Sequence, residues 1–217
     1  MHNAVMAAIP AILAEVSSGC TPRIVGLTVD QVERMMAAGI LREGDPFELI
    51  DGVLVWKDRA PADGDTMAHG VRHATVVNRL QVLDHAVEAV GCVLRVQLPV
   101  VLSPSSAPEP DLSVAHGTRD SYVTRHPGPA DVLLVIEVAD HSLAYDRKTK
   151  QRLYATAGIL RYLLVSLPEE RFELYLDPLP AEGRYARRLD HLPGEMLHAD
   201  LGLAGAIEIE VAAILKR

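Results

Sequence analysis

The segment that most restricts the fold of this chain is a nearly continuous apolar run at residues 132–138, interrupted only by Glu137. Such runs of aliphatic residues are typical of central strands that are buried on both faces of a sheet. A carboxylate at the end of a buried strand is energetically expensive unless it binds a metal, accepts hydrogen bonds or lies at the open edge of the sheet. The run therefore predicts a central strand that carries one acid with a specific purpose.

A second acid stands at the start of another apolar segment. Asp111 follows a proline-rich turn at residues 108–110 and precedes the apolar residues 112–114. Two carboxylates at the ends of neighbouring strands supply the oxygen ligands that a hard divalent cation such as Mg²⁺ prefers. Because such an ion activates water, the pair indicates a metal-dependent hydrolytic site. The alternative is that Asp111 caps a turn and Glu137 ends its strand in a salt bridge.

The rest of the pattern predicts a mixed α/β (α+β) fold. Asp51-Gly52 between two apolar segments is a strong signal for a two-residue hairpin turn. No linker is visible, so we expect a single domain at residues 26–217, preceded by an N-terminal helical extension at residues 1–25. Helices are expected at residues 28–36, 73–90 and 146–157, and further strands at residues 92–98, 100–102, 162–165, 172–176 and 207–211.

The charge of the chain limits its partners. A net charge of −8 argues against a protein that coats nucleic acid by charge alone, because neutralising phosphates needs clustered Lys and Arg. A local basic groove would still favour nucleic acid, and an acidic or closed rim would favour another function. The candidates for such a groove are Arg72, Arg95, Lys148 and Arg152.

Cysteine content and hydropathy address the compartment. Cys20 and Cys92 are too few for a disulfide framework and have no metal-ligand spacing, which predicts a reducing, cytoplasmic compartment. The apolar residues 4–13 predict a short amphipathic helix. No apolar run approaches the roughly 20 residues that a membrane span requires.

Lys150 is the candidate cation of the site. It stands in a charge run at residues 146–152, which would ordinarily be a solvated helix face. At helical spacing, however, Lys150 shares a side with the packing residue Tyr154. Glu137 is one available partner for its ammonium, and Asp146 at i, i+4 is the other.

Three further polar residues could support the site. Glu48 shares a strand face with Ile50, so both a semi-buried third carboxylate and an exposed edge glutamate are open. His73 begins the long helix, as a cap or a supporting group, and Gln97 could hydrogen-bond a site carboxylate or a metal-bound water. The sequence lacks the Gly-x-Ser-x-Gly, Walker, dinucleotide-binding and zinc-ligand patterns.

With these landmarks the chain resembles the Uma-type putative restriction endonuclease family, a bacterial branch of the PD-(D/E)XK nuclease superfamily. The segments that match follow the family's order from about residue 26 to residue 176. They are residues 47–52, His73, residues 97–100, residues 108–112, residues 135–140, the pattern Asp146-x-x-x-Lys150-x-x-x-Tyr154, Gly158-Ile159 and Tyr162.

The resemblance implies a restriction endonuclease-like core, a mixed β-sheet flanked by helices with an acidic site at one end. It implies Asp111 and Glu137 as ligands of Mg²⁺, with Mn²⁺ as a substitute, and as catalytic residues together with Lys150. The superfamily's usual lysine follows the glutamate by two residues, where this chain has Ala139. The family pattern places the catalytic lysine on the following helix instead, at Lys150. Leu163 also departs from the tryptophan of many relatives, which affects the core rather than the chemistry.

The activity implied is an endonuclease that hydrolyses DNA phosphodiester bonds, with nucleic acid as the partner. A homodimer is a further expectation, from the apolar N-terminal helix and the habits of the superfamily. The alternative is a catalytically weak or inactive relative that serves as a binding or oligomeric interaction module. Hydrolysis of another phosphate ester is a third hypothesis.

Overall fold

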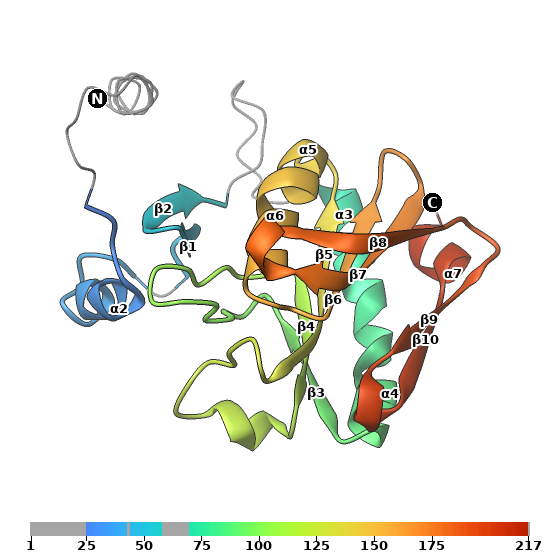
Figure 1. The fold of residues 1–217 in the computed structure, drawn as a ribbon, viewed down its shortest axis with the longest axis horizontal. Coiled ribbons are helices and arrows are strands. Elements are labelled where there is room, and N and C mark those ends of the chain that lie inside the picture. The colour runs from blue at the N-terminus through green and yellow to red at the C-terminus, as the bar shows by residue number, and fades with distance from the viewer. Residues whose placement is uncertain (1–24, 43, 58–69, 217) are drawn as a thin grey trace.

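A six-stranded mixed sheet forms the centre of the molecule in this computed structural model, which describes residues 25–42, 44–57 and 70–216 (Figure 1). The strand order is β3-β4-β5-β6-β7-β8, and every neighbouring pair is antiparallel except β5 and β6, which are parallel. The strands are β3 (Cys92–Val96), β4 (Leu112–His116), β5 (Val132–Ala139), β6 (Arg161–Ser166), β7 (Arg171–Leu179) and β8 (Arg184–His191).

The predicted central strand is confirmed as β5, which is buried along its whole length. Its parallel pairing with β6 requires a crossover connection. That connection is helical and consists of α5 (Leu143–Tyr145), a π-helical turn η3 (Asp146–Lys150) and α6 (Gln151–Thr156). The predicted helix at residues 146–157 is therefore confirmed in place, but it begins earlier and contains a π turn.

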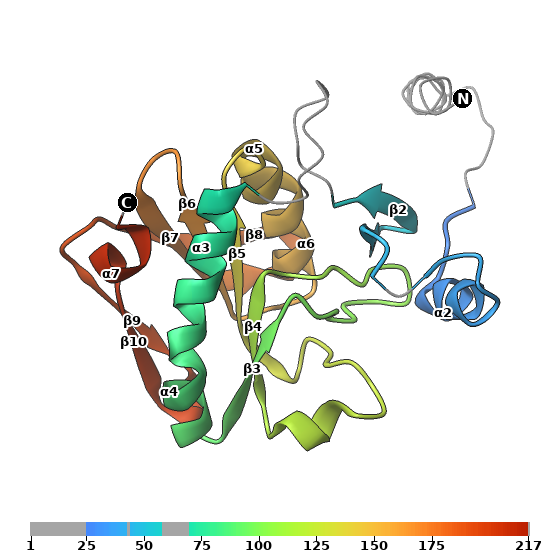
Figure 2. The ribbon, with the colours of Figure 1, turned by 180° about the vertical axis from the view of Figure 1, so that it is seen from behind.

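Helices cover both faces of the sheet (Figures 1 and 2). One face packs under α3 (Val71–Leu80), the 3-10 turn η1 (Gln81–Leu83) and α4 (Asp84–Ala89), together with α7 (Val211–Leu215). The opposite face packs under α6. Residues of β5 alternate between the two cores, since Ile136 and Val138 belong to the first and Val135 and Ala139 to the second. The single helix expected at residues 73–90 is divided into α3 and α4 by the 3-10 turn η1.

A hairpin and a helix lie to one side of the main sheet, beside the loop that joins β3 to β4 (Figure 1). The hairpin strands are β1 (Phe47–Ile50) and β2 (Val53–Trp56). Asp51 and Gly52 both have positive φ, 48° and 82°, which is the geometry of the predicted two-residue turn. The helix α2 (Val29–Ala37) begins with a capping box, in which Thr28 and Gln31 bond each other's backbone.

Other expectations are corrected by the structure. Residues 100–102 do not form a strand; Pro99 interrupts the backbone, and Val100 N–H donates to Pro108 O instead (2.9 Å). The predicted edge strand near residues 207–211 is β10 (Ala206–Glu210), which pairs with β9 (Met196–Asp200) in a separate two-stranded sheet. Short 3-10 turns stand at Arg119–Tyr122, Pro180–Glu182 and Gly202–Ala204.

The expectations for the N-terminal extension and for Cys20 lie outside the described residues, and the domain boundary at residue 26 stays a prediction. Cys92 is buried and is a free thiol. Within the described part of the chain, no helix has the length and apolar character needed to cross a membrane.

Candidate functional site

The two carboxylates that the sequence singled out lie side by side at one end of the sheet. The antiparallel register of β4 and β5 pairs Leu112 with Ile136, so Asp111 stands next to Glu137. The backbone N–H of Asp111 donates to Glu137 Oε2 (3.3 Å), and the backbone N–H of Val138 donates to Asp111 Oδ2 (2.8 Å). Both side chains are buried, Glu137 completely. Hydrogen bonds to the charged form stabilise a carboxylate in such a place.

Lys150 joins this pair from the π-helical turn. Its ammonium Nζ lies 3.1 Å from Glu137 Oε1 and 2.6 Å from Glu48 Oε2, and the whole residue is buried. Of the two partners open for Lys150 from the sequence, the structure shows Glu137. It adds Glu48, which lies 102 positions away in the sequence.

Glu48 is a buried acid of β1, so the interpretation as an exposed edge glutamate is wrong. Its Oε2 also accepts a hydrogen bond from the backbone N–H of Glu109 (3.3 Å). The hairpin therefore contributes a third carboxylate to the assembly, and it does so from outside the main sheet.

His73 supports the other side of the pair. It lies in the first turn of α3, is buried, and places Nε2 at 3.1 Å from Asp111 Oδ2. A carboxylate oxygen can only accept, so the imidazole donates through Nε2–H in this contact. The same oxygen accepts from the Val138 amide, which fixes the orientation of Asp111.

Tyr154 is a member of the assembly that the sequence interpretation assigned only to packing. Its hydroxyl donates to Glu137 Oε1 (2.8 Å), the same oxygen that contacts Lys150. Burial, and then the nearby carboxylates Glu137 and Glu48, raise the pKa of this phenol well above its ordinary value, so it stays a hydrogen-bond donor. The signal was its spacing, since Tyr154 follows Lys150 by one helical turn.

Gln97 contacts the site through its backbone. Its N–H donates to Asp111 O (3.0 Å), and its φ of 49° lies in the left-handed region. Its side chain is exposed and, among the described residues, forms no hydrogen bond with the carboxylates. The expected side-chain contact with a site carboxylate is not met in this structure, and a contact with a metal-bound water stays a prediction.

The candidate basic rim is largely neutralised. Arg72 pairs with Glu170 (3.2 Å) and Arg152 pairs with Asp51 (2.5 Å). Arg95 is buried, and its guanidinium donates to Pro99 O (3.4 Å). Lys148 is exposed on the π-helical turn.

The donor chemistry of the pair suits a hard cation. Asp111 and Glu137 offer carboxylate oxygens, and Mg²⁺ is commonly held by one or two carboxylates while it retains several waters. Among the described residues, no group of three or more His, Cys, Asp or Glu side chains is arranged as a metal cage. Two carboxylates fit an ion that takes one or two ligands from the protein.

Comparisons with known proteins agree with this architecture. A family model described as "Uma2: Putative restriction endonuclease" matches residues 29–212. A crystal structure described as a putative nuclease belonging to DUF820, from Anabaena variabilis, superposes with a TM-score of 0.58 at 15% identity and covers 87% of this chain and 97% of its own. At that identity the likeness shows the fold, a mixed sheet flanked by helices. No curated protein matches the chain.

Proposed function

The chain belongs to the Uma2 restriction endonuclease family, and on this premise we propose that it hydrolyses phosphodiester bonds of DNA at Asp111, Glu137 and Lys150. The observation that carries the proposal is the position of Lys150. Its ammonium, completely buried, lies 3.1 Å from Glu137 although the position two residues after Glu137 is Ala139. The helix after β5 thus supplies the cation that the strand lacks.

Asp111 and Glu137 would hold Mg²⁺, with Mn²⁺ as a substitute. When bound, such an ion polarises a phosphodiester oxygen and lowers the pKa of a coordinated water. The neighbouring groups then have separate tasks. Lys150 stabilises negative charge that develops on the phosphate, and Tyr154 and Glu48 hold the Glu137–Lys150 pair in place through bonds of 2.8 and 2.6 Å.

His73 keeps Asp111 in position. Its contact of 3.1 Å with Oδ2 and the hydrogen bond from the Val138 amide hold this oxygen in place, and they thereby set the orientation of the Asp111 carboxylate. A supporting group of this kind orients a ligand without touching the substrate.

The test is a cleavage assay on single- and double-stranded DNA with Mg²⁺ or Mn²⁺, using Asp111→Asn and Glu137→Gln. Each variant removes one ligand charge with little change of shape, so cleavage should be lost and calorimetry should show weaker Mg²⁺ binding. Asp120→Asn and Glu210→Gln make the same chemical changes at exposed positions outside the site and should behave as the parent. If both site variants cut as well as the parent, the assignment of the ligands is wrong.

A second candidate function is a nuclease-fold module that binds or assembles without efficient cleavage. The ion pairs of Arg72 and Arg152 and the burial of Arg95 favour it, because paired or buried arginines attract phosphate weakly. This function would be indicated if the folded parent cut neither form of DNA with either ion. A homodimer is part of the same proposal, and sedimentation would measure it.

A further inference from the structure

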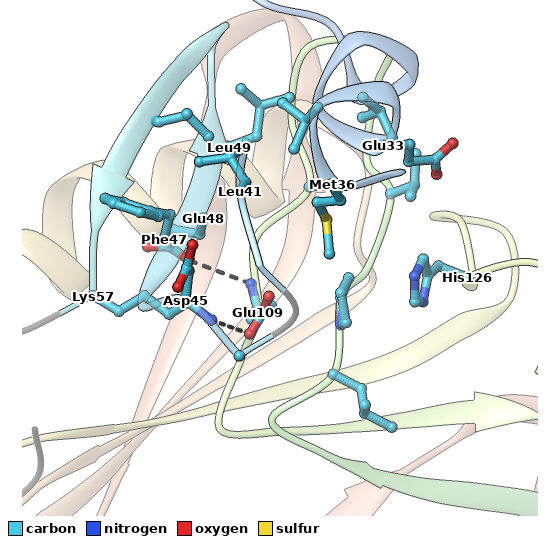
Figure 3. A pocket seen from close by; sticks show the side chains of 18 of the residues that line it. Glu33, Met36, Leu41, Asp45, Phe47, Glu48, Leu49, Lys57, Glu109 and His126 are labelled. Atoms are coloured by element: carbon cyan, nitrogen blue, oxygen red, sulfur yellow. Dashed lines mark hydrogen bonds and ion pairs between the residues drawn. The ribbon is translucent and has the colours of Figure 1, made fainter. Parts of the chain in front are cut away.

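A cavity of about 410 Å³ lies beside the site, between α2, the β1–β2 hairpin and the loop that follows β3 (Figure 3). Small-molecule sites have volumes of about 300–1,000 Å³, so this space is large enough for a compact ligand group. The chemistry proposed above uses only one residue of its wall, Glu48.

Much of the wall is apolar. Val32 and Met36 come from α2, Phe47 from β1, and Leu41 and Leu98 from the neighbouring loops. None of the residues of α2 is buried, although the helix is amphipathic, so its apolar side is open to an occupant of the cavity. These surfaces suit a group with wide nonpolar faces.

The polar groups of the wall are mostly acceptors. Lys57 is already paired with Glu109 (Figure 3). The other cation of the lining is Arg42. An ionised carboxylate can only accept hydrogen bonds and repels an anion. Of the four carboxylates in the wall, Glu109 is paired with Lys57 and Glu48 with Lys150, and the other two are Glu33 and Asp45. The wall therefore disfavours an anionic occupant, and an uncharged occupant should present N–H donors to Glu33 and Asp45.

His126 does not reverse this balance. Burial, and then the nearby Arg95, lower the pKa of its imidazole, so it is uncharged at neutral pH. Phosphate binding in this cavity is disfavoured for the same reason, since His126 adds no positive charge to the wall.

Glu48 connects the cavity to the site. Its side chain lines the cavity, and its Oε2 lies 2.6 Å from Lys150 Nζ, which in turn contacts Glu137. Two other wall residues adjoin Asp111, since Gln97 N–H donates to Asp111 O (3.0 Å) and Glu109 precedes it by two positions. We therefore take the nucleotide next to a phosphate at Asp111 and Glu137 to lie within reach of the cavity. The part of a nucleotide that is uncharged, planar and edged with N–H donors is the base.

We propose that this cavity receives one unpaired nucleobase with an exocyclic amino group, from a nucleotide next to the bond that is cut. The inference rests on the proposed function, because it takes the phosphate to lie at the Asp111–Glu137 pair. A base inside a duplex is stacked and uses its amino group for pairing, so it cannot enter without leaving the helix. The cavity therefore favours single-stranded or unpaired DNA.

The test titrates the full chain with deoxycytidine and with deoxyuridine, in the absence of metal. These nucleosides differ at ring position 4, where the first carries an amino group and the second a carbonyl oxygen, and at N3, which accepts a hydrogen bond in the first and carries a proton in the second. Trp56 is the single tryptophan of the chain and its ring lies 4.7 Å from that of Phe47 in the cavity wall, so its fluorescence reports occupancy. Deoxycytidine should give a saturable change, and deoxyuridine should bind at least about tenfold more weakly, as expected for a lost hydrogen bond to a charged group.

Leu98→Tyr tests whether binding takes place in the cavity, because it places a larger side chain there from a loop residue that is 44% exposed. It should weaken deoxycytidine binding at least about tenfold. Leu192→Tyr makes the same change at a residue that is 53% exposed and does not line the cavity, and it should bind as the parent.

Equal affinity for the two nucleosides, no saturable change with either, or unaltered binding by Leu98→Tyr would overturn the inference. Because the titration needs neither metal nor cleavage, it separates the two proposals. Deoxycytidine binding by a chain that cuts no DNA would sustain the cavity assignment and reject the nuclease, and cleavage without nucleoside binding would do the reverse.

Discussion

At the residue scale, Lys150 determines whether two buried carboxylates can be tolerated. Glu48 and Glu137 are 4% and 0% exposed, and both contact its ammonium. Removing one partner of a buried ion pair leaves an uncompensated charge and typically costs about 3–5 kcal/mol. We therefore expect Lys150→Met to lower the free energy of unfolding by about this amount, measured by denaturant titration. Where the variant remains folded, turnover should fall more than Mg²⁺ affinity, because Lys150 is not a ligand.

The double variant Lys150→Met/Glu48→Gln tests the cause. It removes one of the two carboxylates that lose their cation in Lys150→Met, so it should recover part of the lost stability relative to Lys150→Met alone. A loss in the double variant equal to the sum of the two single losses would show that Lys150 acts by packing rather than by charge.

The sequence singled out Asp111 and Glu137 because each is an acid at the end of an apolar strand, and Lys150 because it shares a helix side with the packing residue Tyr154. It could not settle the environment of Glu48, because the contact with Lys150 joins positions 102 residues apart. It also missed the hydroxyl of Tyr154, because helical spacing places this residue beside Lys150 but does not show that its polar end meets a carboxylate.

At the element scale, two glycines separate the cost of a left-handed backbone conformation from the cost of steric crowding. Gly158 follows α6 with a φ of 77°, and a Cβ there would meet no atom within 4 Å. Gly52 in the hairpin turn has a φ of 82°, and its Cβ would lie 2.8 Å from the Cα of Gly26. Gly158→Ala should cost about 1–2 kcal/mol from the left-handed conformation alone. Gly52→Ala should cost more, and denaturant unfolding of the two variants measures the difference.

Equal losses would mean that the segment at Gly26 moves aside without cost. A larger loss for Gly158→Ala would contradict the close approach of the hairpin to residue 26. The comparison matters for the site, because the same hairpin carries Glu48 on β1.

Elements with a strong hydrophobic period were predictable, and elements defined by tertiary contacts were not. Val100 and Leu102 are 0% and 9% exposed, so their apolar character correctly indicated burial. Pro99 nevertheless prevented a strand at these residues. The edge strand β8 is almost entirely exposed and rich in charge, so it gave no alternating signal. The π-helical turn η3 also has no sequence mark, although such turns often stand at functional sites.

At the scale of the whole molecule, the order of segments predicted the fold class because the buried run of β5, the crossover helix and the flanking strands agree with one another. A fold class can be predicted from sequence when the local patterns agree with the overall packing. The net charge of −8 did not indicate the charge around the site, because that depends on which charged side chains pair with one another, as Arg72 does with Glu170 and Arg152 with Asp51.

Carboxylates with lowered pKa values contribute to the acid sensitivity of the molecule. Hydrogen bonds from Arg125 lower the pKa of Asp131 to about 2 from its usual 3.8, and hydrogen bonds from Arg147 lower that of Glu169 to about 2 from 4.5. A lowered folded-state pKa gives stability that is complete above the ordinary pKa and is lost as the pH falls through the folded value. The free energy of unfolding should therefore fall between about pH 4.5 and pH 2.

Arg125→Gln isolates one contribution to this acid sensitivity. Arg125 Nη1 and Nη2 lie 2.6 and 2.9 Å from the two oxygens of Asp131, so the variant should lose stability at neutral pH and show a shallower fall toward pH 2. Arg34→Gln is the control, because the Arg34–Asp30 pair is 76% and 66% exposed and exposed pairs contribute little. Chemical unfolding at a series of pH values measures both slopes. Parallel curves for the parent and Arg125→Gln would show that Asp131 does not contribute to the acid sensitivity.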